Sequence, residues 1–256
     1  MGHMDELEIQ GYTVLPNFFD SEFLGRLIYD LDEWMEIAHN VRVENGLGNV
    51  MAGVAHQILG RNDSMADLIK MLPWHDLLQD FFGGPYILNS FSAVKNVSNK
   101  QNSYQHVKNF HRDVRTFSGD FKLMINVLVM LEDFTTANGA TQVVPGSHVV
   151  EAKPSESSII KRAVTLEGSA GTVVLFDSNL WHAASQNFDG SPRRALTLNY
   201  SRPFMKQQAD FCKIVGPEFS SDPDVMQVVG FRSRVPESHS DWYQPIEKRF
   251  YYADQG

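Results

Sequence analysis

The apolar residues of this chain predict a mainly β protein with flanking helices. Short runs rich in valine, isoleucine, leucine and phenylalanine, separated by glycine, proline and asparagine, are typical of strands. The run at 121–132 is apolar at almost every position, which indicates a central strand that is buried on both faces. The other expected strands are 11–19, 86–97, 101–113, a short stretch between Asn138 and His148, 164–166, 172–176 and 195–200.

A helical period is present in the first third of the chain. After Asp20, a good N-cap residue, apolar side chains recur at three- and four-residue intervals up to Ala38 and predict a helix that covers the outside of a sheet. Two shorter helices are expected at 64–72 and 74–82, before Gly83 and Gly84. The segment 41–60 is glycine-rich and irregular, so we interpret it as a lid or loop.

Length and composition favour one domain. With 256 residues, of which 43% are hydrophobic, the chain can bury a large core, and barrels of this size are commonly undivided. We expect a single domain over 5–256, with an N-terminal helical cover (5–84), a β core (85–203) and a C-terminal tail (204–256). The proline-rich, aromatic tail is expected to wrap the domain or a partner subunit. We interpret Met1-Gly-His-Met4 as a cloning remnant.

Charge narrows the class of ligand. A net charge of −9 argues against a surface for nucleic acid or an anionic membrane, so a small molecule is the expected partner. The chain has no run long enough for a membrane span and no signal peptide at its start. A single cysteine, Cys212, excludes an internal disulfide and fits a cytoplasmic protein. Both a monomer and a homo-oligomer are compatible with this pattern.

Candidate metal ligands stand near the middle of the chain. His111 and Asp113 are two residues apart, so on an extended backbone both side chains project from one face. His182 follows an apolar strand and a turn, which makes it the best candidate for a third ligand. Two histidines and one carboxylate suit non-haem Fe(II) that handles O2 and a chelating co-substrate. The pattern alone is weak, because a histidine after a tryptophan is more often an ordinary packed or surface residue.

Further motifs make the interpretation more specific. In order along the chain they are His111-Arg-Asp113, Asn138-Gly-Ala-Thr-Gln-Val-Val-Pro-Gly-Ser-His148, Phe176-Asp-Ser-Asn-Leu-Trp-His182, Asn187 and Pro192-Arg-Arg194. Together they resemble the phytanoyl-CoA hydroxylase-like (PhyH) family of Fe(II)/2-oxoglutarate oxygenases. The resemblance implies a double-stranded β-helix, that is, a jelly-roll or cupin-like core, over 85–203.

The resemblance also implies a chemistry. His111, Asp113 and His182 would bind Fe(II), and an arginine after the second histidine would bind the far carboxylate of 2-oxoglutarate. With O2, and with ascorbate supporting activity, such enzymes release succinate and CO2 and usually hydroxylate an unactivated C–H bond. Related halogenases have a small residue in place of Asp113, so the carboxylate here favours hydroxylation, desaturation or ring formation. Histidine 148 lies outside the metal shell in family members.

Two residues are expected to contact 2-oxoglutarate. With a two-residue period, Arg193 shares a face with Ala195, Thr197 and Asn199, which leave room for a ligand, whereas Arg194 shares a face with bulky apolar residues. We therefore predict Arg193 as the anchor, although a β-bulge after Pro192 would reverse the faces. Asn126 is a polar residue in a buried strand and needs a partner, so it is either a structural hydrogen-bonding group or a co-substrate contact.

The substrate is the least determined part. Arg115 and Phe117 are substrate-contact candidates because they follow the metal ligands. Basic residues around them predict a substrate with a negative group, although such a cluster is usually only a solvated surface; they are Lys95, Lys100, Lys108, Arg112, Arg115 and Lys122. Two alternatives to the oxygenase are a cupin-like metal enzyme that does not use 2-oxoglutarate and a non-catalytic jelly-roll binding protein.

Overall fold

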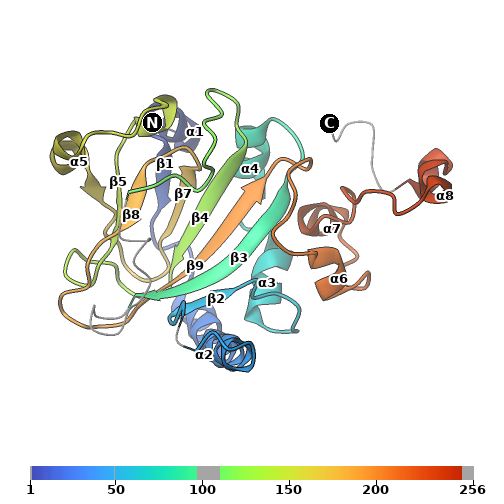
Figure 1. The fold of residues 1–256 in the computed structure, drawn as a ribbon, viewed down its shortest axis with the longest axis horizontal. Helices are drawn as coiled ribbons and strands as arrows, with labels where there is room; N and C mark the ends of the chain where they lie inside the picture. Colours follow the sequence, from blue (N-terminus) through green and yellow to red (C-terminus); the bar gives the residue numbers. More distant parts are fainter. Residues whose placement is uncertain (1, 49, 97–109, 250–256) are drawn as a thin grey trace.

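Two antiparallel sheets form the body of the protein. The computed structural model describes residues 2–48, 50–96 and 110–249, and Figure 1 shows the arrangement of the elements. The six-stranded major sheet has the order β1-β7-β4-β9-β3-β2 and the minor sheet the order β6-β5-β8. The strands are β1 (Tyr12–Leu15), β2 (Val54–His56), β3 (Ile87–Asn96), β4 (Met124–Met130), β5 (Thr141–Val143), β6 (Val164–Thr165), β7 (Val173–Asp177), β8 (His182–Ala184) and β9 (Arg193–Ser201).

The central strand is the one that the sequence predicts. β4 lies between β7 and β9, and all seven of its residues are buried. Its side chains alternate between two apolar clusters: Val127 and Val129 belong to the cluster on the outer face, while Leu128 and Met130 belong to the cluster between the sheets. A strand with two buried faces cannot show a polar and an apolar side, which explains its continuous apolar sequence.

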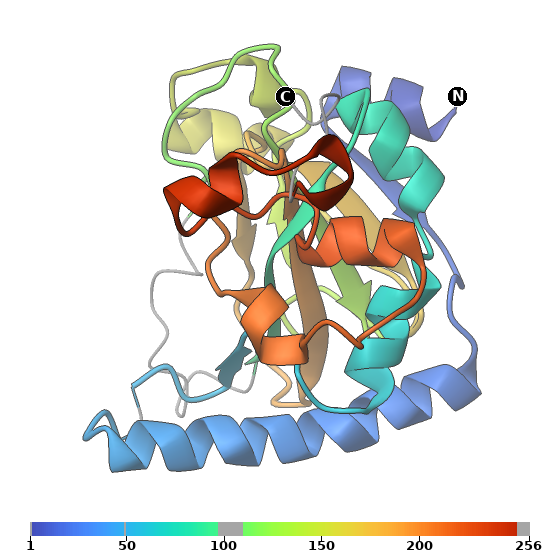
Figure 2. The same cartoon turned by 90° about the vertical axis from the view of Figure 1, so that its right-hand side faces the viewer.

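Helices cover the outer face of the major sheet. The long helix α2 (Ser21–Glu44) runs along one side of the molecule, as Figure 2 shows, with Asp20 capping its first turn. Its Leu27 and Leu31 are fully buried in the outer cluster. No helix within the described ranges is both long and apolar enough to cross a membrane. The other helices of the first 84 residues are α1 (His3–Gln10), α3 (Ser64–Met71) and α4 (His75–Phe82).

Two features of the first 84 residues differ from the predictions. Helix α2 continues to Glu44, and β2 pairs with β3, so the segment 41–60 is only partly irregular. β1 and β2 belong to the major sheet, and the β core therefore includes strands from before residue 85.

Part of the C-terminal tail packs against the domain. Phe211, Val225 and Val228 are buried in the outer cluster, and α7 contacts β3. Up to residue 249, where the described part ends, the tail has only short helices, as its prolines predict: α6 (Phe211–Val215), α7 (Pro223–Val229), α8 (His239–Trp242) and the 3-10 turn η3 (Ile246–Lys248). Along the chain, the connection from β5 to β6 contains the 3-10 turn η2 (Ser147–Val149) and the helix α5 (Glu156–Arg162).

Strand β9 separates the core from the space between the sheets. Leu196 and Leu198 are fully buried against the helices, while Thr197 and Asn199 point the other way, into a cavity. We expect Leu198→Ala to lower the free energy of unfolding by about 2–5 kcal/mol, because it removes buried methyl groups and leaves a void.

Urea denaturation followed by circular dichroism measures this loss. The matched control is Leu47→Ala, since Leu47 is 50% exposed and should change the free energy of unfolding by about 0.5 kcal/mol or less. Equal effects of the two substitutions would contradict the assignment of Leu198 to the core.

Candidate metal centre and cavity

The two predicted histidine ligands are direct neighbours. His111 and His182 form an antiparallel bridge, in which the His111 amide donates to the His182 carbonyl (2.9 Å) and the His182 amide donates to the His111 carbonyl (3.1 Å). His182 begins β8 at the edge of the minor sheet, so the bridge adds His111 to that edge. The two ring centroids are 4.4 Å apart as a result.

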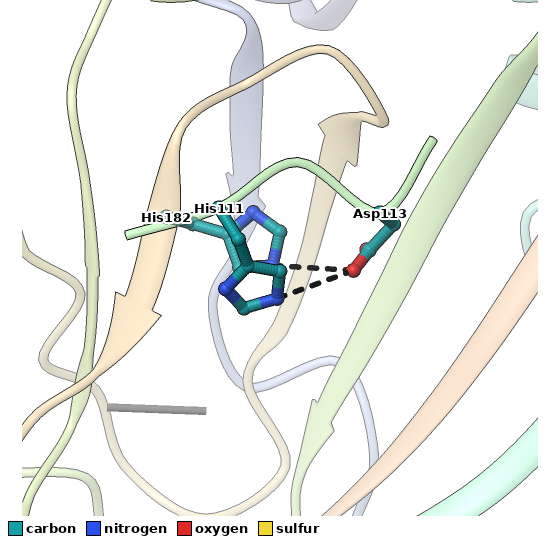
Figure 3. Close-up of side chains that lie close together, drawn as sticks. All are labelled: His111, Asp113 and His182. Atoms are coloured by element: carbon teal, nitrogen blue, oxygen red, sulfur yellow. Dashed lines mark ion pairs between the residues drawn. The ribbon is translucent and has the colours of Figure 1, made fainter. Parts of the chain in front are cut away.

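Asp113 completes a group of three candidate ligands. Its Oδ1 lies 3.4 Å from His111 Nε2 and 3.6 Å from His182 Nε2, and Figure 3 shows the three side chains converging. One ligand atom from each residue lies within 4.8 Å of the other two. A single ion can therefore contact all three on one side and keep its opposite positions open, which fits the 2-His-1-carboxylate arrangement of non-haem iron.

The environment favours the protonation states that bind a metal. Burial raises the pKa of Asp113, but His182 and His111 lower it more, so the pKa lies below its ordinary value. Burial lowers the pKa of His182, with Asp113 opposing this effect. The Leu180 carbonyl lies 2.9 Å from His182 Nδ1, and because a carbonyl only accepts, Nδ1 carries the proton and Nε2 keeps its lone pair. Carboxylate and neutral imidazole are the ligand forms.

The triad opens into a cavity of about 300 Å³ between the sheets. Thr141 and Ala184 line it from the minor sheet, and Asn126 and Phe176 line it from the major sheet. Within the described ranges, neither polar atom of the Asn126 amide makes a hydrogen bond of normal geometry, although the amide is close enough to Asp113 to lower the pKa of that carboxyl. Asn126 therefore has hydrogen-bonding capacity in the cavity that a bound molecule can use.

Arg193 brings a buried positive charge to the same cavity. The residue is 3% exposed, its Nη1 donates to Thr141 Oγ1 (3.3 Å), and its guanidinium lies over the Phe134 ring. Among the described residues, its Nε has no hydrogen-bond partner. Burial lowers the pKa of Arg193 to about 10, with Glu132 opposing this shift. A buried guanidinium without a carboxylate partner is costly, so the site fits a bound anion such as the far carboxylate of 2-oxoglutarate.

Arg194 points to the outer face, as the strand period predicts. Its Nε and Nη2 donate to Glu132 Oε1 at 2.9 and 2.6 Å, and its Nη1 donates to Asp32 of α2 at 3.2 Å. The two neighbouring arginines therefore have different surroundings. Arg194 connects the sheet to α2, whereas Arg193 lines the cavity.

The predicted substrate contacts lie outside this cavity. Arg115 is exposed, and Phe117 packs against the Arg112 guanidinium; neither is among the described residues that line the cavity. The residues of the predicted basic cluster also lie in different surroundings. Lys122 pairs with Asp177 (3.3 Å), and Lys95 is the cross-strand neighbour of Arg194 and shares its outer face. Lys100 and Lys108 lie outside the described residues.

Arg112 is a structural residue rather than part of a basic pocket mouth. It is 5% exposed, and its guanidinium donates to the Asn179 carbonyl (2.7 Å), the Glu151 carbonyl (2.8 Å) and the Val150 carbonyl. It also lies over the Trp181 ring. Arg112 thus connects the segment of the first two ligands to the turn that precedes the third.

The sequence-based predictions did not include the residues that form one wall of the cavity. Ser90 and Ser92 of β3 line it, together with His56 of β2 and Gln208 of the tail. The alternation of serine with buried residues in β3 was the available signal. It did not reveal which face of β3 was enclosed.

Comparison with known proteins adds sequence relatives. The profile of the phytanoyl-CoA dioxygenase (PhyH) family matches residues 7–195. The chain is 34% identical over 173 residues to the uncharacterized protein Rv1501 of Mycobacterium tuberculosis, covering 67% of this chain and 61% of that protein. It is also 34% identical over 210 residues to the dioxygenase olcK of Penicillium canescens, covering 75% of this chain and 67% of the relative. The chain spans about six tenths of the length of the mycobacterial relative.

Solved structures share the fold. The epimerase SnoN, in complex with Fe3+, α-ketoglutarate and nogalamycin RO, has a TM-score of 0.60 at 18% identity, covering 86% of this chain and 91% of SnoN. EctD from S. alaskensis, with 2-oxoglutarate and 5-hydroxyectoine, has a TM-score of 0.58 at 20% identity, covering 77% of this chain and 74% of EctD. These similarities confirm the predicted jelly-roll, cupin-like fold.

The contacts of Arg112 generate a prediction about the metal centre. We expect Arg112→Met to weaken Co(II) binding by about 10- to 100-fold, because residues that orient metal ligands have effects of this size. Spectroscopic titration of the metal-free protein with Co(II) measures the change. Arg115→Met is the matched control, since Arg115 is exposed. Unchanged Co(II) affinity in a folded Arg112→Met protein would contradict the orienting role.

Proposed function

This chain belongs to the phytanoyl-CoA dioxygenase family, and we propose that it is a non-haem Fe(II) oxygenase that consumes 2-oxoglutarate and O2. The proposed reaction converts a C–H bond of a small-molecule substrate, 2-oxoglutarate and O2 into the corresponding alcohol, succinate and CO2. The observation that carries this proposal is the combination, in one cavity, of the His111, Asp113 and His182 triad with the buried cation of Arg193.

Each residue has a defined task in this proposal. His111, Asp113 and His182 would hold the iron, which supplies the activation of O2. Arg193 would bind the far carboxylate of 2-oxoglutarate through charge-assisted hydrogen bonds, and the hydroxyl group of Thr141 supports the position of the guanidinium. Asn126 would use its amide in the cavity to contact the co-substrate near Asp113.

The shape of the site supports this reaction class over the two alternatives. A metal enzyme that does not use 2-oxoglutarate has no need for a buried, incompletely partnered arginine in the same cavity as its metal ligands. A binding protein that had lost turnover would not need to keep Asp113 between the two histidines.

Succinate formation tests the proposed activity. Aerobic incubation of the protein with Fe(II), ascorbate and 2-oxoglutarate should release succinate, slowly without substrate, and Asp113→Ala should lose both iron and succinate formation because only three protein bonds hold the ion. Asp120→Ala is the matched control, since Asp120 is an exposed carboxylate on the segment that follows Asp113 in the sequence.

Two results would contradict the assignment. Iron content and succinate release at wild-type levels in Asp113→Ala would remove Asp113 from the metal centre. No succinate from the iron-loaded wild-type protein would favour the binding-protein alternative.

The two neighbouring arginines give a separate test of the co-substrate anchor. We expect Arg193→Met to weaken 2-oxoglutarate binding by about 2–4 kcal/mol, the cost of losing one partner of a buried charge pair, and Arg194→Met to leave it nearly unchanged. Anaerobic isothermal titration calorimetry with the Fe(II)-loaded proteins measures both. A large loss confined to Arg194→Met would show that the other arginine is the anchor.

A further inference from the structure

A polar wall occupies the side of the cavity next to the metal centre. Two cross-strand rows of the major sheet contribute to it. In the first row, His56 of β2 pairs with Ser92 of β3, which pairs with Thr197 of β9. In the second row, Ser90 pairs with Asn199. Directly paired residues share one face of a sheet, and all five residues line the cavity.

The wall is continuous with the candidate metal centre. Asn199 pairs with Asn126 of β4, and Asn126 lines the same cavity as Asp113. At the other end, Gln208 of the tail adds an amide to the cavity lining and accepts a hydrogen bond from Gln57 (3.4 Å). The polar surface therefore extends from the metal ligands to the segment that follows β9.

Hydrogen bonds hold the side chains of this wall in place. The Asn199 amide donates to Ser90 Oγ (2.8 Å), and the Thr197 hydroxyl group donates to the Ser92 carbonyl (3.3 Å). His56 Nδ1 lies 3.1 Å from Ser92 Oγ. On the opposite face of the same strands, Phe91 and Leu198 are fully buried against the helices. The serine, threonine and asparagine side chains of the two rows are therefore on the cavity side, away from this apolar packing.

We propose that this wall is the substrate subsite and that it selects an uncharged, hydroxyl-rich compound such as a sugar unit. This inference rests on the proposed oxygenase function, because it places the substrate beside the metal centre. The six residues of the subsite are His56, Ser90, Ser92, Thr197, Asn199 and Gln208.

The chemistry of these side chains distinguishes between ligand classes. Hydroxyl, amide and imidazole groups each offer both a donor and an acceptor, and a ligand hydroxyl group also does both. A carboxylate only accepts, so it would leave acceptors of the wall unpaired and add a buried charge, since Arg193 binds the co-substrate in this scheme. An apolar ligand would remove water from the wall without replacing its hydrogen bonds.

The dimensions of the wall match a ring-sized ligand. Neighbouring strands are about 4.8 Å apart, and residues two positions apart on one strand are about 6.6 Å apart. Two rows across β3 and β9 therefore form a grid of the size of one six-membered ring with its hydroxyl groups. The cavity of about 300 Å³ is at the small end for ligand sites, which limits the substrate group at the wall to about one such unit.

Ligand binding to the metal-free protein, with 2-oxoglutarate present to occupy Arg193, tests the subsite independently of turnover. Saturation-transfer NMR compares methyl glycosides of the common hexoses and pentoses with the matched uronates, which carry a carboxylate, and with methoxycyclohexane, which lacks hydroxyl groups. At least one neutral glycoside should bind more tightly than both its uronate and methoxycyclohexane. Tighter binding of the uronates or of methoxycyclohexane, equal binding of the three classes, or no binding of any neutral glycoside would overturn the proposal.

Substitutions locate the binding site. His56→Phe should weaken binding of the preferred glycoside by about fivefold, the effect of losing one neutral hydrogen bond. His39→Phe is the matched control, because His39 is exposed on α2, and it should leave binding unchanged. Asn199→Leu is a second variant, with circular dichroism to verify its fold. Equal affinity in wild type and both cavity variants would place the glycoside elsewhere and overturn the proposal.

A parallel succinate assay separates the two proposals. If the wild-type protein releases succinate from 2-oxoglutarate but neutral glycosides do not bind, the subsite proposal fails and the oxygenase proposal stands. If glycosides bind at the wall but no succinate forms under any condition, the oxygenase proposal fails. The wall would then bind glycosides without being the substrate subsite of an oxygenase, so the subsite proposal fails with it.

Discussion

The antiparallel bridge between His111 and His182 is the constraint on which the candidate site depends. Because the two backbones exchange both amide hydrogen bonds, the imidazole rings leave the edge of the minor sheet side by side. Asp113 needs no separate element, since it follows His111 by two residues. The backbone pairing of His111 with His182 therefore determines where all three candidate ligands lie. The Arg112 side chain connects this pairing to the turn before His182.

The two-residue period of strands explains what the sequence predicts well. On β9 it separates Arg193, which lines the cavity, from Arg194, which binds carboxylates on the outer face. It also identifies β4 as a central strand in which Asn126 is the exceptional polar residue. These predictions need only local sequence, because a strand that is buried on a known face distributes its side chains by simple alternation.

Other parts of the site depend on distant pairings that no local pattern reveals. β2 has only three residues, and its place at the sheet edge depends on its register with β3, so its sequence was interpreted as a loop. Ser90 and Ser92 resemble the solvent face of an ordinary strand until the minor sheet encloses them. Arg112 resembles part of a basic surface, but carbonyl groups of the segment near Glu151 surround its guanidinium.

The buried guanidinium of Arg193 links co-substrate supply to the persistence of the folded chain. Without a bound anion, the protein bears the cost of a desolvated charge whose Nε has no hydrogen-bond partner in the part of the chain that the structure describes. If 2-oxoglutarate is that anion, its binding adds RT ln(1 + [L]/Kd) to the stability of the native state, about 2.7 kcal/mol when the ligand is at 100 times its Kd. 2-Oxoglutarate would then stabilise the folded protein that binds it. Cells depleted of 2-oxoglutarate would degrade the protein faster, and cells rich in 2-oxoglutarate would contain more of the protein.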